Sequence, residues 1–195
     1  MKKLVLTMIV GLGFGMFANA QTDKGTITIG GNFGYDYSKV VDVDGHVQNY
    51  SIMPKIGYLV QDNLELGLGL GYAGSTDTDS FDVKSTIGEF AVAPYLRKLY
   101  GNSDVKFFTQ VAVPMGWGNA KHDGTELGTT ERYGVSLAPG IAYSPKSNFA
   151  VELSIKGLYY EYSSVTPDGG SKVASNSFGL DANSFMPSIG FNFYF

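Results

Sequence analysis

The feature that most constrains how this chain can fold is a two-residue alternation between apolar side chains and small or polar ones. One face of residues 50–60 carries Tyr50, Ile52, Pro54, Ile56, Tyr58 and Val60. From Leu64 to Tyr72, leucine or tyrosine occupies every second position, with Glu65 and three glycines between them. Because successive side chains of a β-strand point to opposite faces, this period indicates strands. The alternation recurs along the chain and predicts an all-β protein.

The face opposite the apolar side chains is mostly glycine, alanine and serine, with few charges. A soluble β-sandwich would carry long polar side chains on that face, because it would meet water. Narrow side chains instead suit the crowded interior of a small closed barrel whose apolar face meets lipid. The pattern therefore predicts a transmembrane β-barrel, and a soluble periplasmic β-protein is the alternative. Charges are scarce on the apolar faces, where arginine or lysine would cost about 2–4 kcal/mol at the bilayer midplane.

Eight stretches carry the alternation, and each is long enough for a tilted membrane strand, which needs about 9–11 residues. They are Thr26–Tyr37, Asn49–Val60, Leu64–Ala73, Ser85–Tyr100, Val105–Gly118, Thr130–Tyr143, Asn148–Tyr162 and Ser177–Phe195. Pro54 argues against regular pairing within the second stretch, because proline has no N–H to donate to a ladder. Tyrosine and phenylalanine near the strand ends fit aromatic girdles at two membrane boundaries.

The connections between these stretches alternate in length. The short ones are 61–63, 101–104 and 144–147, and the long ones are 38–48, 74–84, 119–129 and 163–176. Outer-membrane barrels have short periplasmic turns and longer extracellular loops. We therefore predict an eight-stranded antiparallel up-and-down transmembrane β-barrel with short periplasmic turns and four longer extracellular loops. An even strand count places both termini on the short-turn side.

Residues 1–20 have the features of a cleavable secretory signal peptide. Lys2 and Lys3 precede an apolar run from Leu4 to Ala18, and the segment ends in Ala-Asn-Ala before Gln21. A transmembrane anchor is the alternative, but a membrane-spanning helix needs roughly 20 apolar residues and this run is shorter and contains glycine. We expect residues 21–195 to form one barrel domain in the bacterial outer membrane.

The net charge gives no indication of a nucleic-acid partner, and the absence of cysteine rules out disulfides. Without residues 1–20, which contain two lysines and no acid, the chain has 12 basic and 18 acidic residues and a net charge of −6. An acidic chain of this kind gives no indication of nucleic acid as a partner. The chain has no cysteine, so disulfides cannot supply its rigidity. A closed, hydrogen-bonded barrel would supply it instead.

The last stretch ends in Gly-Phe-Asn-Phe-Tyr-Phe, which places Phe191, Phe193 and Phe195 on one face. This ending resembles the C-terminal assembly signal of outer-membrane barrels, and residues 21–195 resemble the outer membrane protein β-barrel domain family. Members are small porin-like proteins similar in architecture to the transmembrane domain of the outer membrane protein A group. The resemblance implies biogenesis by the barrel-assembly machinery and periplasmic chaperones. It implies a monomer in contact with outer-membrane lipid and lipopolysaccharide, and no catalytic motif transfers.

Charged residues on the inward-facing positions form a mixed set. They are Lys55, Glu65, Glu89, Arg97, Lys106, Arg132, Glu152 and Lys156. Buried charges must pair, since an unpaired one costs several kcal/mol. We therefore predict a structural ion-pair network in the lumen, with Glu65 and Arg97 as neighbours near the periplasmic end. A closed plug is favoured over a gate or narrow conducting path, because eight strands leave little open lumen.

Other residue patterns in the chain do not complete a reactive or ligand-binding site. Nucleophilic catalysis would need a histidine beside a serine and a carboxylate, and His46 and His122 both fall in predicted loops. The acidic spacings at 42–45 and 77–82 do not complete an EF-hand. The glycines from Gly67 to Gly71 alternate within a strand and are not followed by a helix, unlike a phosphate loop. We therefore expect no catalytic residue, metal or cofactor.

The sequence-based hypothesis for function is correspondingly general. We expect an integral outer-membrane protein, structural and surface-exposed, whose loops could bind a ligand or partner. A narrow porin-like channel for small solutes and an outer-leaflet lipid-modifying enzyme are the alternatives. Loop recognition leaves no motif that separates these roles.

Overall fold

The computed structural model describes residues 22–39, 45–101, 103–146, 148–181 and 188–195. Its strands are β1 (Ile27–Lys39), β2 (His46–Gln61), β3 (Leu64–Thr78), β4 (Lys84–Tyr100), β5 (Val105–Ala112), β6 (Met115–His122), β7 (Thr125–Lys146), β8 (Phe149–Ser154), β9 (Gly157–Pro167), β10 (Val173–Asp181) and β11 (Ser188–Tyr194). Residues 1–20, predicted to be a signal peptide, lie outside the described residues.

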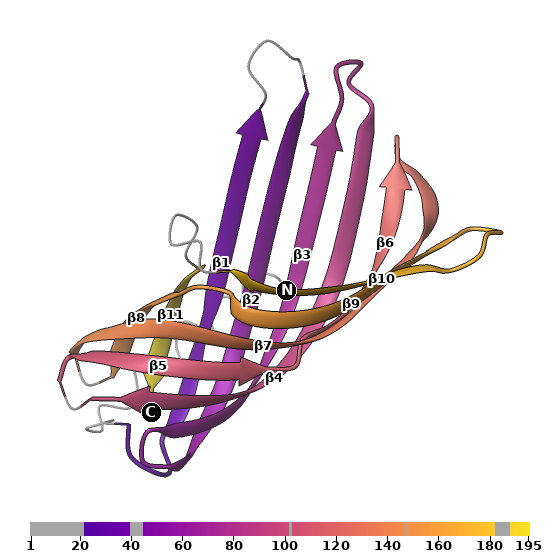
Figure 1. The fold of residues 1–195 in the computed structure, drawn as a ribbon. Coiled ribbons are helices and arrows are strands. Elements are labelled where there is room, and N and C mark those ends of the chain that lie inside the picture. Colours follow the sequence, from indigo (N-terminus) through magenta and orange to yellow (C-terminus); the bar gives the residue numbers. More distant parts are fainter. Residues whose placement is uncertain (1–21, 40–44, 102, 147, 182–187) are drawn as a thin grey trace, which may run out of the picture.

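The strands form a closed antiparallel barrel of eight strands, as predicted (Figure 1). Three of the eight consist of two segments each, namely β5 with β6, β8 with β9, and β10 with β11. The ring runs from β1 through β2, β3, β4, β5, β7, β8 and β11, and it closes because β11 pairs with β1 from Thr28–Tyr194 to Phe33–Ile189. We call the end that holds Thr22 and Phe195 proximal and the opposite end distal.

The alternation in the sequence sets which side chains face outward. Ile29 lies opposite Ile56, and both point to the outside, whereas the next pair, Gly30 and Lys55, points to the lumen. Outward apolar residues are strongly exposed, as with Phe33 at 61%. A one-residue slip would turn all of these side chains into the polar lumen, so the burial pattern fixes the register.

Pro54 lies inside β2 without ending the strand. It lies opposite Gly31 of β1, while the ladder to β3 is interrupted at this point and resumes in the same register. The missing N–H of proline explains the local gap in pairing. The prediction of irregular pairing at Pro54 therefore holds on one side of the strand.

The predicted bounds of the long connections were too wide. The distal connections cover residues 40–45, 79–83, 123–124 and 168–172, because the strands continue past the predicted ends as paired hairpins. Figure 1 shows the hairpins β1–β2 and β3–β4 rising side by side at the distal end. Polar and charged residues make up most of these extensions, and they pair across the ladder although they bury no apolar face.

Outward aromatic rings mark two levels along the barrel. On β7, Tyr133 and Tyr143 both face outward and are ten residues apart. At about 3.4 Å per residue and a tilt near 40°, they are separated by about 26 Å along the barrel axis, close to the apolar band of about 25 Å in outer-membrane barrels. Rings at the distal level also cover glycines, because a Cβ at Gly88 would lie 2.3 Å from the Tyr72 hydroxyl.

Candidate functional site

The proximal half of the lumen contains a buried cluster of charges centred on Arg97. Its Nη1 lies 2.8 Å from Oε1 of Glu152 and 3.5 Å from Oε2 of Glu65. Arg97 is 1% exposed and Glu65 is 0% exposed. The three residues come from β4, β3 and β8, so the cluster ties together strands from opposite sides of the barrel.

Neutral polar side chains supply further hydrogen bonds to these charges, although, among the described residues, Oε2 of Glu65 has only its 3.5 Å contact with Arg97. Oε1 of Glu65 accepts hydrogen bonds from Tyr95 and Thr28, both at 2.6 Å. Arg97 also donates to Oε1 of Gln110, at 2.8 Å from Nη2 and 3.1 Å from Nε, and Asn192 donates to Glu152 at 2.6 Å. A buried ion pair is tolerable when such bonds satisfy its remaining donors and acceptors. The arrangement therefore favours a single, well-defined interior.

Small residues make room for this cluster. A Cβ at Gly57 would lie 2.1 Å from Oε1 of Glu65, and one at Gly67 would lie 2.3 Å from the Tyr95 ring. Gly67 of β3 therefore leaves space for Tyr95 of β4, and Gly69 and Gly71 leave space for Met53 of β2. This gives the small-residue face a direct structural role.

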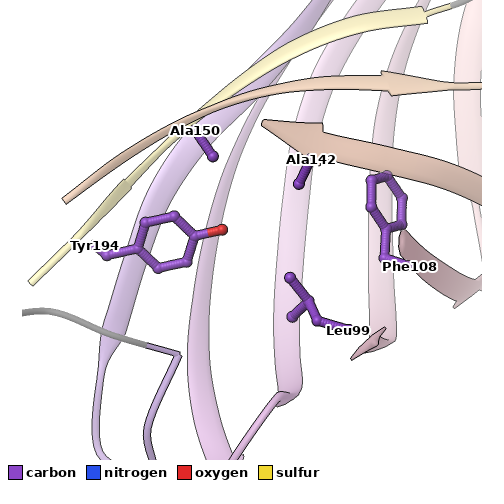
Figure 2. Close-up of a cluster of buried hydrophobic side chains, with 5 residues drawn as sticks. All are labelled: Leu99, Phe108, Ala142, Ala150 and Tyr194. Atoms are coloured by element: carbon purple, nitrogen blue, oxygen red, sulfur yellow. The ribbon is translucent and has the colours of Figure 1, made fainter. Parts of the chain in front are cut away.

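An apolar cluster fills the lumen on the proximal side of these charges. Its members are Leu99, Phe108, Ala142, Ala150 and Tyr194 (Figure 2). The Phe108 ring also packs on the Arg97 guanidinium, 4.7 Å from ring centroid to Cζ. Among the described residues, the charged and apolar clusters together fill the proximal half of the barrel.

The distal half of the lumen is more open. A cavity of about 940 Å³ is lined by residues of β1–β4, β7 and β11, including Asp36, Asn49, Glu89 and Arg132. Arg132 lies 3.3 Å from Glu89 and 3.7 Å from Glu161 and is 45% exposed. Strand β6 lies between β4 and β7 here, and its Gly118 leaves room for Glu89, because a Cβ at Gly118 would lie 2.7 Å from the Glu89 side chain.

The eight charged residues predicted for the lumen thus fall into separate groups. Glu65, Arg97 and Glu152 meet in the proximal cluster, and Glu89 meets Arg132 in the distal one. Within the described part of the chain, no carboxylate lies at ion-pair distance from the three lysines Lys55, Lys106 and Lys156. Lys55 lies beside the proximal cluster, because its Nζ and the Arg97 guanidinium both lie over the Tyr95 ring, but it does not join the ion pairs.

Each of these lysines makes another contact. Lys55 lies over the Tyr95 ring at 5.7 Å, and Lys156, in the break between β8 and β9, lies over the Tyr159 ring at 3.6 Å. Lys106 donates a hydrogen bond to Oγ1 of Thr22, which in turn donates to Asn63 at 2.6 Å. The segment before β1 is therefore hydrogen-bonded to β5 at the proximal end of the barrel.

The neutral partners of the charges were missed by reasoning on charged residues alone. Thr28, Tyr95, Gln110 and Asn192 all occupy inward-facing positions of their strands. Their parity in the sequence would have identified them, because each is an even number of residues from an inward neighbour.

The two histidines lie in strands rather than in the predicted loops, because the ladder extends further than expected. His46 begins β2 and its ring lies 5.6 Å from that of Tyr37. His122 ends β6, and its Nδ1 lies 3.0 Å from Oγ of Ser85. Among the described residues, no carboxylate is hydrogen-bonded to the His122 ring, so the third member of a catalytic triad is missing.

The C-terminal phenylalanines lie on the outer face of the barrel. Phe149 stacks on Phe191 with centroids 6.2 Å apart and contacts Phe193 at 5.1 Å. The backbone N–H of Phe195 donates to the carbonyl of Ile27, so the end of the chain completes the seam with β1. The predicted role of these residues in assembly remains a proposal.

The acidic spacing at residues 77–82 builds a turn. Oδ1 of Asp79 accepts hydrogen bonds from the backbone N–H groups of Phe81 and Val83. The residues 42–44 of the other acidic spacing lie outside the described part of the chain. Among the described residues, no three potential ligands gather into a metal site. No helix in the described residues is long and apolar enough to cross a membrane.

A closed eight-stranded antiparallel barrel with an apolar outer face and a polar interior is the fold of the small outer-membrane β-barrels. Two crystal structures share it. Neisserial surface protein A (NspA) matches with a TM-score of 0.52 and 14% identity, over 88% of this chain and 98% of that one. The outer membrane protein OprG from Pseudomonas aeruginosa matches with a TM-score of 0.53 and 14% identity, over 91% and 98%. No family model matches the sequence, and no curated protein matches it.

Proposed function

We propose that this chain is an integral protein of the bacterial outer membrane that is closed to solutes and presents its distal hairpins at the cell surface. Residues 1–20 act as the cleaved export signal, and the barrel-assembly machinery and periplasmic chaperones deliver residues 21–195 as a monomer. The proposal that the barrel is closed rests on the proximal lumen, where Arg97 is buried between Glu65 and Glu152. The distal cavity then opens away from the periplasm, in a position to receive a ligand from outside.

The membrane location is supported by the outer surface of the barrel. Large apolar side chains cover it between two levels of aromatic rings, and an exposed surface of this size would make a soluble protein aggregate. Comparing the mobility of unheated and boiled protein on a detergent gel, together with membrane fractionation, tests this location. We expect a heat-dependent shift and recovery in the outer membrane. A soluble periplasmic fraction with no shift would rule the proposal out.

Conductance in planar bilayers tests whether the barrel is closed. We expect no steady single-channel current from the wild type, because buried charges and buried apolar side chains occupy the proximal lumen. Replacing Arg97 and Phe108 with alanine removes two large side chains that pack on each other in this part of the lumen and provides an opened comparison. A steady current from the wild type would favour the narrow channel instead.

A further inference from the structure

Three aromatic side chains form a continuous patch on the outward face at the distal ends of β6, β7 and β9. The rings of Trp117 and Tyr133 meet edge to face at 6.0 Å, and Tyr133 lies 6.3 Å from Tyr162. The Trp117 indole N–H donates to the Tyr133 hydroxyl at 3.0 Å. We call these three residues the distal aromatic patch. Trp117 is the one tryptophan of the chain, so the patch has its own fluorescent reporter.

Charged residues lie directly beyond this patch. Nζ of Lys172 is 5.8 Å from the Tyr162 ring centroid and 2.6 Å from Oε2 of Glu131. The hydrogen bond that Lys172 donates to Glu131 raises the pKa of the Lys172 ammonium. Lys121 faces outward four residues beyond Trp117, opposite Glu126. Lysine has three donors, and Glu131 accepts from Lys172 without using all of them.

Below the patch, toward the middle of the barrel, the same face is apolar. Val135 and Leu137 of β7 and Leu158 of β9 are exposed there. Moving outward along these strands, a lipid molecule would therefore meet hydrocarbon side chains, then aromatic rings, then ammonium groups. This is the order of acyl chain, sugar and phosphate in a phosphorylated glycolipid.

We propose that the distal aromatic patch, with Lys172 and Lys121, binds the phosphorylated sugar headgroup of an outer-leaflet glycolipid. The acyl chains lie along the apolar face of β6, β7 and β9, the sugar packs on the rings, and a phosphate accepts hydrogen bonds from Lys172. This inference rests on the proposed outer-membrane location, which places the distal end of the barrel at the outer leaflet.

Neutralising Glu131 distinguishes phosphate binding from a purely structural ion pair, because the two roles predict opposite effects on affinity. The Glu131 carboxylate repels a phosphate that approaches Lys172, so neutralising Glu131 favours binding, whereas neutralising Lys172 opposes it. If the pair served only to hold the β9–β10 hairpin in place, both substitutions would break the same contact and act in the same direction.

The test is a titration of Trp117 fluorescence in the full-length mature protein, folded in nonionic detergent. The probes are diphosphoryl lipid A, monophosphoryl lipid A and phosphatidylglycerol. We expect saturable binding of diphosphoryl lipid A, weaker binding of the monophosphoryl form, and at least tenfold weaker binding of phosphatidylglycerol. Lys172→Gln should weaken lipid A binding about fivefold and Glu131→Gln should tighten it by a similar factor, because one lysine near an anionic surface contributes about 1 kcal/mol. Lys146→Gln, an exposed lysine at the proximal end of β7, is the matched control and should change nothing.

Three results would overturn the proposal. They are a signal that does not saturate, equal affinity for phosphatidylglycerol and lipid A, and a change in the same direction for Lys172→Gln and Glu131→Gln. Because the titration uses purified protein, its failure leaves the mobility and fractionation results standing. A protein that binds lipid A but fractionates outside the outer membrane would contradict only the proposed location.

Discussion

Replacing Arg97 with methionine removes the positive charge from the proximal cluster and leaves its two carboxylates in place. Glu65 is fully buried and Glu152 is 4% exposed, so neither charge can turn to solvent without moving the strands. Methionine fills much of the same volume, so the main loss is electrostatic. Breaking a buried ion pair by removing one partner typically costs about 3–5 kcal/mol.

Urea unfolding of the barrel in phospholipid vesicles measures this loss. With an m value near 2 kcal/mol/M, the midpoint should fall by about 2 M. Arg132→Met is the matched control, because Arg132 also faces two carboxylates but is 45% exposed. A partly exposed pair contributes at most about 1 kcal/mol, so the control should lower the midpoint far less.

A triple variant separates charge from packing. Arg97→Met combined with Glu65→Gln and Glu152→Gln removes all three charges while keeping oxygens that can accept from Tyr95, Thr28 and Asn192. Neutral replacements of buried ion pairs often restore stability, so we expect most of the loss to be recovered. If Arg97→Met is no worse than Arg132→Met, or if the triple variant is as unstable as Arg97→Met, the electrostatic account of the proximal cluster is refuted.

Three further predictions concern packing, assembly and topology. Gly67→Ala should lower the free energy of unfolding by about 1–3 kcal/mol in the same urea assay, because its Cβ would lie 2.3 Å from the Tyr95 ring. Gly116→Ala, whose Cβ would have its nearest neighbour at 3.6 Å, should change it much less. Replacing Phe191 and Phe193 with serine should reduce the fraction of heat-modifiable barrel in membranes, and unchanged assembly would exclude the proposed signal. Asp79→Cys at the β3–β4 turn should react with a membrane-impermeant maleimide on intact cells. Asp104→Cys at the proximal end should react only after lysis. The reverse pattern would show that the proximal end faces the cell surface.

The strands and their faces could be predicted because their information is local. The two-residue period of Leu64, Leu66 and Leu68 predicts that these side chains share one face of the strand. This prediction does not depend on which strand lies beside it. Glu65, Arg97 and Glu152 lie inward for the same reason. The connection bounds were less accurate, because polar extensions such as those around His46 and His122 lack an apolar face and their pairing depends on the neighbouring strand.

The sequence by itself determined the all-β class, the closed barrel of eight strands and the parity that sends glycine and charge inward. Only the tertiary structure decided which inward charges meet, because contact across the lumen depends on the stagger between strands far apart in the chain. It brought Arg97 of β4 to Glu152 of β8, placed Lys55 on the Tyr95 ring beside that cluster, and gave Lys106 and Lys156 contacts with Thr22 and Tyr159 instead. It also assembled the distal aromatic patch, since Trp117, Tyr133 and Tyr162 are neighbours only after β6, β7 and β9 pair.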